Sequence, residues 1–175
     1  GKAIYLDSDM IVFRDIKRLF DENVEMVPYR TNDHDTSVIL INCRLAKWNI
    51  KDIVESLDRK RSTYSSLFLD LQSQGPPIDS YWNSHDRLLD GNAHGYSNKH
   101  TALLHYTTVR TQPWIAKGHP LEYLWFDILF EMLDRDIVTF GDIEREITKG
   151  SLRPSINYQL EKRLSSSQNL PLSIR

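Results

Sequence analysis

Residues 2–13 read KAIYLDSDMIVF, and this stretch decides how the rest of the chain folds. The apolar run that ends at Leu6 predicts a buried strand, because it is too short for a helix. Two carboxylates, Asp7 and Asp9, follow the strand, and a second apolar run begins at Met10. Side chains two residues apart on an extended backbone point to the same side, so both carboxylates can face one point.

The spacing of Asp7 and Asp9 leaves two interpretations. Carboxylates held this close repel each other unless a positive charge lies between them. Carboxylate oxygens are good ligands for Mg²⁺ and Mn²⁺, so the pair predicts a divalent-metal site. Alternatively, Asp9 caps a turn and Asp7 is solvated, which is the commoner role of an isolated Asp-x-Asp. Other residues have to decide between the two.

Length and composition predict one α/β domain that spans residues 1–175, with a frayed tail over 165–175. Hydrophobic residues make up 40% of the 175 positions and charged residues 26%, which is ordinary for a soluble globular protein. The net charge of −2 argues against a nucleic-acid partner. No apolar run approaches the ~20 residues of a transmembrane segment.

Cys43 is the single cysteine, so the chain can form no internal disulfide. A reducing compartment, and therefore a cytoplasmic location, is the expected setting. Because Cys43 adjoins an apolar run, we expect it to be an inert thiol in the core.

Hydrophobic periodicity predicts the remaining elements. Two further strands are expected, over 38–42 and 102–106. Helical segments are expected over 14–20 (capped by Asp15), 49–57 (capped by Asn49), 64–71, 120–133, 142–149 and 155–164. The polar stretch 79–101 is expected to be a long functional loop. The helix over 120–133 is apolar on so much of its surface that it should be buried or pack on a partner, which permits a homo-oligomer.

His105 is the third candidate for the site. It lies near the end of the predicted strand 102–106. A single histidine in such a place is more often a hydrogen-bonded core residue than a ligand. Beside an Asp-x-Asp, however, an imidazole completes a plausible divalent-metal site with open positions for substrate oxygens.

Four motifs in order resemble a known family. They are LDSD at 6–9, TSVILIN at 36–42, WN at 82–83, and LHY at 104–106 closing on PW at 113–114. Together they resemble the metal-dependent glycosyltransferases of family 8 and their bacterial relatives, over residues 1 to about 118. The resemblance implies a partial GT-A fold (a Rossmann-like mixed sheet) with C-terminal helices.

The resemblance also implies roles for residues. Asp7 and Asp9 would hold Mn²⁺ (or Mg²⁺) against the diphosphate of a nucleotide-sugar, UDP-linked by family habit, and His105 would be the third ligand. Asp35 stands where the family often has a sugar-binding asparagine, so it would bind the donor sugar, or else it caps the turn before the strand. The implied activity is hexose transfer to an unknown acceptor, which could be a glycan, a lipid-linked sugar or a protein.

Two departures from the family pattern affect the donor site. Gln112 stands where the family often has a lysine that grips the diphosphate, and Arg110 is our first choice for the missing cation, ahead of Lys99 and Lys117. Trp114 would either stack on a sugar or pack in the core. An Asp-Gln pair that family members show before Trp82 cannot be placed, so retention or inversion at the sugar carbon is undecided.

The chain begins without Met inside a predicted core strand. We therefore expect it to be a piece of a longer polypeptide that lacks the first nucleoside-binding units of the family. Such a piece should bind metal weakly and nucleotide poorly.

Two rival functions remain. One is a catalytically degenerate relative that binds sugar or acts as a scaffold. The other is an aspartate-nucleophile phosphatase, which also places Asp-x-Asp after an apolar strand. That family prefers Thr or Val two residues after the second acid, where this chain has Ile11.

Overall fold

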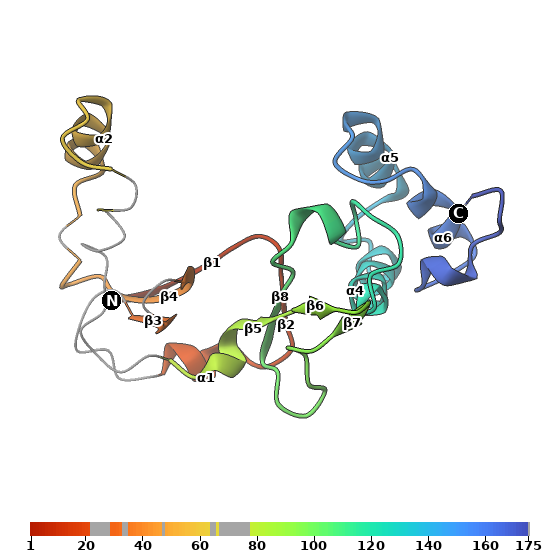
Figure 1. Ribbon diagram of the computed structural model, residues 1–175, viewed down its shortest axis with the longest axis horizontal. Helices are drawn as coiled ribbons and strands as arrows, with labels where there is room; N and C mark the ends of the chain where they lie inside the picture. The colour runs from red at the N-terminus through yellow and green to blue at the C-terminus, as the bar shows by residue number, and fades with distance from the viewer. Residues whose placement is uncertain (22–28, 33–34, 47, 64–65, 67–77, 175) are drawn as a thin grey trace. The chain divides into compact units, whose positions relative to one another are not determined.

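The computed structural model describes residues 1–21, 29–32, 35–46, 48–63, 66 and 78–174 (Figure 1). The described chain is mixed α/β, with two three-stranded sheets, a two-stranded hairpin and several helices. Its contacts form two compact units, where the sequence predicted one domain. The first unit holds Gly1–Ser84 and Ser97–His105, and the second holds His85–Tyr96 and Tyr106–Arg175.

The first sheet has the strand order β1-β4-β3. Strand β1 (Lys2–Leu6) pairs antiparallel with β4 (Asp35–Asn42), and β4 pairs with β3 (Tyr29–Asn32). The strand predicted over 38–42 is confirmed and begins three residues earlier than expected. Val38, Ile39 and Leu40 are buried in the middle of this strand, and β-branched side chains such as Val38 and Ile39 pack well on the pleated surface of a sheet.

The second sheet has the order β2-β8-β5. Strand β2 (Met10–Val12) pairs antiparallel with β8 (Leu103–His105), and β5 is Ser84–His85. The short link Asp7-Ser8-Asp9 therefore carries the chain from the first sheet into the second. Residues 2–13 form two strands of different sheets, with both acids in the link between them.

Helix α1 (Lys17–Phe20) and the 3₁₀ turn η1 (Ser80–Asn83) complete the described core of the first unit. Asp15 accepts a hydrogen bond from the backbone N–H of Lys17, although the N-cap position itself is Ile16. Trp82 is buried. The buried members of this core are Leu19, Val38, Leu40, Ile78, Trp82, Ala102 and Leu103.

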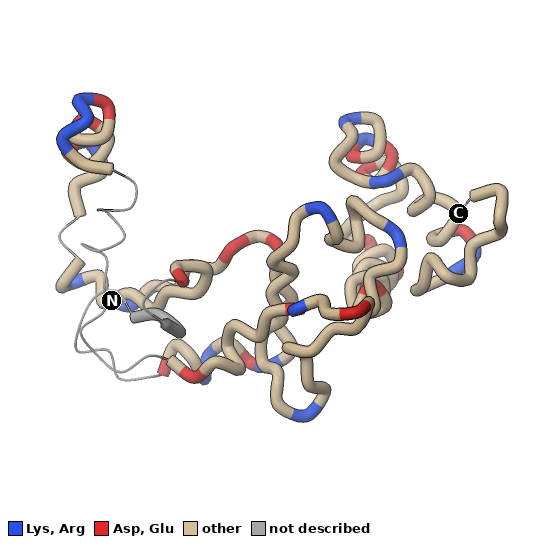
Figure 2. The backbone as a smooth tube through the Cα atoms, viewed as in Figure 1, with Lys and Arg blue, Asp and Glu red and all other residues tan. Residues whose placement is uncertain are grey.

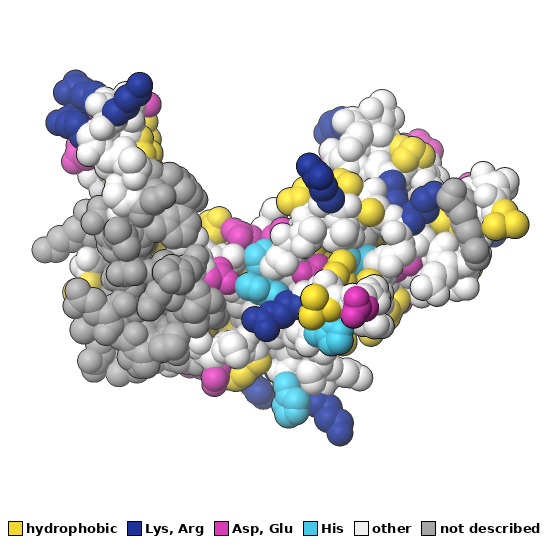
Figure 3. Space-filling model, viewed as in Figure 1, with side chains coloured by type: hydrophobic (Ala, Val, Ile, Leu, Met, Phe, Trp, Pro, Cys, Tyr) yellow, Lys and Arg dark blue, Asp and Glu magenta, His cyan; other side chains and the backbone are white. Residues whose placement is uncertain are grey.

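Helix α2 (Ile50–Asp58) begins as predicted, with the side chain of Asn49 accepting from the N–H of Lys51. Acidic and basic residues are interspersed along this helix and the turn that follows it (Figure 2), and the space-filling view shows hydrophobic side chains beside them (Figure 3). Among the described residues of this helix none is buried, and Ile50 and Val54 are exposed. The helix predicted over 64–71 lies outside the described residues, apart from residue 66.

Cys43 is exposed, so the prediction of a core thiol is wrong. Strand β4 ends at Asn42, and the chain turns immediately afterwards. The apolar run that suggested burial therefore stops before the cysteine.

The stretch predicted as a long loop contains regular structure. Strands β6 (Leu88–Leu89) and β7 (Asn92–Ala93) form a hairpin whose turn is Asp90-Gly91. Both turn residues have positive φ, which is the backbone conformation that Asp-Gly hairpin turns require.

The second unit contains the best-predicted helices. They are α4 (Glu122–Asp134), α5 (Phe140–Lys149) and α6 (Ser155–Glu161), with the 3₁₀ turns η2 (Val109–Thr111) and η3 (Ser167–Asn169). Helix α4 begins at Glu122 rather than at Pro120, because the N–H of Glu122 closes a turn on the carbonyl of His119. None of the helices in the described part of the chain has the length and apolarity that a membrane crossing requires.

The apolar face of α4 packs inside its own unit. Phe126 and Leu129 are buried with Ile143, Ile156 and Leu160. Partly buried side chains from α4 and α5 pack against them, namely Trp125, Phe130, Leu133 and Ile147. The first alternative for this helix, burial, is therefore the observed one. A homo-oligomer stays a prediction, but this face no longer supports it.

Glu122 ties the end of the chain to α4. One carboxylate oxygen accepts hydrogen bonds from the backbone N–H of Ser167 at 2.5 Å and from the hydroxyls of Ser166 and Ser167. The other oxygen faces the guanidinium of Arg153 at 3.4 Å, and both charged groups are buried. The prediction of a frayed tail over 165–175 is therefore wrong as far as Leu170, which is also buried.

We expect Glu122→Gln to lower the free energy of unfolding of the second unit by about 3 kcal/mol, because it leaves Arg153 buried without its opposite charge. Denaturant unfolding, with hydrogen exchange of amides in α5 and α6, measures the loss. Glu131→Gln is the matched control, since Glu131 pairs with Arg135 in solvent on the same helix and should cost under about 1 kcal/mol. An equal loss of stability in Glu122→Gln and Glu131→Gln would contradict the stabilising role of the buried Glu122 carboxylate.

A second buried pair joins Asp86 and His119. His119 Nδ1 accepts the N–H of Leu121, so Nε2 carries the proton and donates to Asp86 at 3.1 Å. The other oxygen of Asp86 accepts from the N–H and the hydroxyl of Thr107. Burial raises the pKa of Asp86, but the hydrogen bonds from His119 and Thr107 outweigh it, so this pKa lies below its ordinary value.

This pair predicts acid sensitivity of the second unit. The stabilisation from Asp86 is fully present above the unfolded-state pKa of about 3.9 and is lost as the pH falls through the lower folded-state pKa. At neutral pH, Asp86→Asn should lower the free energy of unfolding by about 1–3 kcal/mol. The difference should shrink in denaturant titrations below about pH 4. Asp127→Asn, at an exposed carboxylate of α4, is the control for the removal of one charge. A difference between wild type and Asp86→Asn that is constant with pH would count against the pair.

Candidate metal centre

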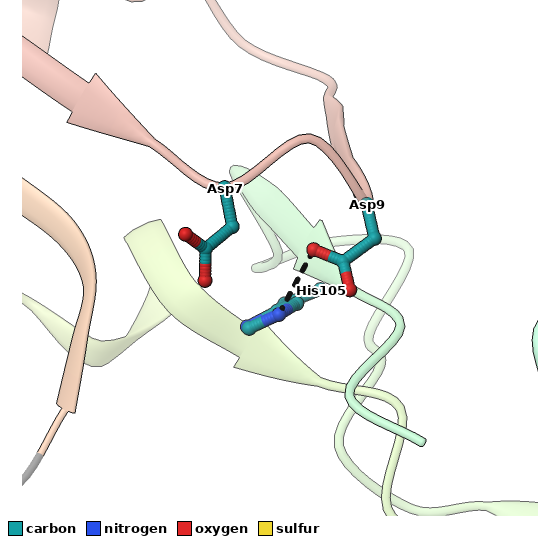
Figure 4. A group of neighbouring side chains, drawn as sticks. All are labelled: Asp7, Asp9 and His105. Carbon is teal, nitrogen blue, oxygen red and sulfur yellow. Dashed lines mark ion pairs between the residues drawn. The ribbon is translucent and has the colours of Figure 1, made fainter. Parts of the chain in front are cut away.

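Asp7, Asp9 and His105 come together in the first unit (Figure 4). One potential ligand atom from each residue lies within 4.8 Å of the other two. The Nε2 atom of His105 is 3.2 Å from Oδ1 of Asp9. The convergence of these three side chains is what the sequence predicted. That they bind a cation stays a prediction.

Strand register explains the convergence. In the antiparallel pair β2–β8, Met10 lies opposite His105, so the imidazole is beside the residue that precedes β2, which is Asp9. Asp7 follows β1, and its backbone N–H donates to the carbonyl of Ser37 at 3.0 Å. The ligands therefore lie at the ends of three strands: Asp7 follows β1, Asp9 precedes β2, and His105 is the last residue of β8.

The spacing suits one small divalent cation. Metal–ligand distances of about 2.1 Å place adjacent donors of an octahedral ion about 3 Å apart. The 3.2 Å between His105 and Asp9 is close to that value. The Asp7 carboxylate accepts a hydrogen bond from the Tyr5 hydroxyl and has further acceptor positions that a cation could use.

Burial differs between the ligands. The side chain of His105 is 9% exposed, whereas that of Asp9 is 24% exposed and Asp7 is also half-buried. A cation held here would thus meet the protein on the imidazole side and solvent on the carboxylate side. Three protein ligands leave further positions for oxygens of a substrate or water.

Asp35 does not belong to this group of ligands but lies behind it. Its Oδ1 accepts the N–H of Ser37 at 2.8 Å, which is the turn-capping alternative. Its Oδ2 accepts from the side-chain amide of Asn83 at 2.6 Å. The oxygen of that amide in turn lies 3.2 Å from Nδ1 of His105. A sugar-binding role for Asp35 stays a prediction.

The three predicted donor-site residues belong to the second unit. Arg110 is exposed in η2. Gln112 is buried, and its amide donates to the carbonyl of Tyr106 at 2.9 Å. Trp114 packs against the helical core and contacts the rings of Tyr106 and Trp125, which is the core alternative for this residue.

Sequence reasoning missed the part played by Asn83. The dipeptide Trp82-Asn83 was one of the motifs of the resemblance, but no role followed from it. Asn83 is 6% exposed. A polar amide next to a buried tryptophan is a usable signal, since buried amides are nearly always hydrogen-bonded. Its partners, 48 and 22 residues away, could not be read from the sequence.

We expect Mn²⁺ to broaden the NMR signals of residues 5–10 and 103–105, and Asp9→Asn to weaken this binding at least tenfold, because a carboxylate charge is lost from the centre. Paramagnetic titration suits weak affinities. Asp58→Asn, at an exposed acid of α2, removes the same charge elsewhere and should leave the affinity unchanged. Equal affinity of all three proteins would rule out the centre.

Comparison with known proteins adds no family to these observations. No protein-family model matches the sequence, and no curated protein matches it. The geometry of the centre and the sequence motifs are therefore the basis of the functional argument.

Proposed function

We propose that this chain carries the cation-binding part of a metal-dependent glycosyltransferase with a GT-A fold. The activity would move a hexose from a nucleotide-sugar, UDP-linked as the family resemblance implies, to an acceptor. The single observation that carries the proposal is the convergence of Asp7, Asp9 and His105. These residues occupy the positions that the resemblance assigns to metal ligands.

The chemistry of the donor set fits the reaction. Two carboxylates and an imidazole suit Mn²⁺, and carboxylates also suit Mg²⁺. A cation bound there would neutralise the charge that grows on the diphosphate as the sugar–phosphate bond breaks. Asp7, Asp9 and His105 would hold the cation; the two carboxylates are partly exposed, so a substrate could reach a cation that they hold, whereas His105 is buried.

Other roles are proposed with less support from the contacts. Arg110, being exposed and permanently charged, is the best of the three donor-site residues for binding a diphosphate. Gln112 and Trp114 already make structural contacts in their own unit. The donor sugar, the acceptor and a cytoplasmic location stay predictions.

One rival is favoured by a specific observation. The family lysine is replaced by Gln112, whose amide is engaged with a backbone carbonyl. A protein that keeps the cation centre but has lost a diphosphate contact could bind nucleotide-sugars without transferring the sugar. The test below separates binding from transfer.

The test uses the protein in its full natural length, incubated with UDP-sugars and Mn²⁺ while UDP release is measured. We expect release that depends on Mn²⁺ and is lost on addition of EDTA. Asp7→Asn and His105→Ala should each lower the rate at least about 100-fold, because each removes a ligand that holds charge at the leaving group. Asp58→Asn, the exposed control, should retain the rate.

Three outcomes would count against transfer. Binding of UDP-sugar without release supports the degenerate, sugar-binding alternative. Metal-dependent release of inorganic phosphate from phosphomonoesters supports the phosphatase. Release that survives EDTA and both ligand substitutions would show that the centre is not the site of the reaction.

A further inference from the structure

We propose that Asn83, held by Asp35, is a positioning residue that sets the tautomer of His105 so that Nε2 offers its lone pair to a cation. The inference rests on the proposed metal centre and adds the residues that prepare its imidazole ligand. It assigns a role to Asn83 and a second role to Asp35, neither of which the sequence predicted.

A continuous polar chain runs from the backbone of β4 to the centre. The N–H of Ser37 donates to Oδ1 of Asp35 at 2.8 Å. Nδ2 of Asn83 donates to Oδ2 of Asp35 at 2.6 Å. Oδ1 of Asn83 lies 3.2 Å from Nδ1 of His105, and Nε2 of the same ring lies 3.2 Å from Asp9.

The direction of every bond follows from the first. An ionised carboxylate only accepts hydrogen bonds, so the Asn83 amide must turn its NH₂ group toward Asp35. Its oxygen then faces the imidazole, and Nδ1 must carry the proton that this oxygen accepts. In the neutral ring, Nε2 is then the atom with a lone pair, and it faces Asp9.

That arrangement is suited to metal binding. The Nε2 lone pair and the Asp9 oxygen are two acceptors that a cation between them would join. Metal-bound histidines typically donate their other ring N–H to a carboxylate or carbonyl oxygen, which fixes the ring and raises its basicity. Here the amide oxygen of Asn83 supplies that acceptor, and Asp35 keeps the amide from turning over.

Burial strengthens the hydrogen bonds that connect Asp35, Asn83 and His105. Asn83 is 6% and His105 is 7% exposed, so little water competes for their hydrogen bonds. Asn83 ends η1, directly after the buried Trp82, while Asp35 opens β4. Two elements distant in the sequence thus hold the amide from opposite ends.

The first experiment measures Mn²⁺ affinity by the paramagnetic titration described above. Asn83→Ala should weaken binding about 10–100-fold, the usual effect of removing a partner of a metal-bound histidine. Asp35→Asn should weaken it by a similar factor, since an amide at position 35 permits the Asn83 side chain to turn over. Thr101→Val is the matched control, because it removes a different buried hydrogen bond in the same unit, from the N–H of Ser97. Unchanged affinity in Asn83→Ala would overturn the proposal.

The second experiment reads the tautomer without metal, by long-range ¹H–¹⁵N NMR of the imidazole at pH 8.5, about two units above the ordinary imidazole pKa. The expected wild-type signature is a proton on Nδ1 of His105. Asp35→Asn should shift the population toward a proton on Nε2. A wild-type proton on Nε2 would overturn the proposal, and a merely structural role of Asn83 would leave the tautomer of Asp35→Asn unchanged.

These readouts separate the inference from the proposed function. If metal binding depends on Asn83 but no donor is turned over, glycosyl transfer fails while the positioning role stands. If transfer depends on Asp7 and Asp9, but the His105 tautomer and the Mn²⁺ affinity do not change when Asn83 or Asp35 is substituted, only the positioning role fails.

Discussion

The antiparallel pairing of β2 with β8 is the contact on which the candidate centre depends. It places Met10 opposite His105, and therefore brings the imidazole next to Asp9. The three-residue link that begins at Asp7 passes between two sheets, so its two acids are held by different ladders. A slip of one residue in this register would turn the imidazole to the opposite face of the sheet and disperse the ligands.

The centre is supported by polar contacts as much as by packing. Behind the ligands, Asn83 and Asp35 connect the imidazole to the backbone of β4. Each side chain in this series of hydrogen bonds is a partner of the next one. A buried polar network whose groups are hydrogen-bonded in this way stabilises a single arrangement. The carboxylates of Asp7 and Asp9 are half-buried, whereas His105 is buried.

The second unit also contains buried charged groups with many hydrogen bonds, but these groups have a structural role. Glu122 with Arg153, and Asp86 with His119, are buried pairs whose oxygens accept hydrogen bonds from several donors. They resemble catalytic groups in composition. However, their side chains are almost fully enclosed, so a substrate could not reach them. Accessibility, rather than residue type, is what distinguishes the candidate centre from these pairs.

The sequence by itself determined the strands of 2–6 and 38–42, the capped helix after Asn49, and the choice of Asp7, Asp9 and His105, because short-range periodicity and charge spacing encode them. It could not show that residues 2–13 contribute to two sheets, that Cys43 lies past the end of its strand, or that Glu122 fastens the tail. Only the tertiary structure decided the role of Asn83, whose partners lie 22 and 48 residues away. The physical reason is that the direction of a hydrogen bond depends on which groups lie close together in the folded chain, and the local sequence does not specify partners that are distant along it.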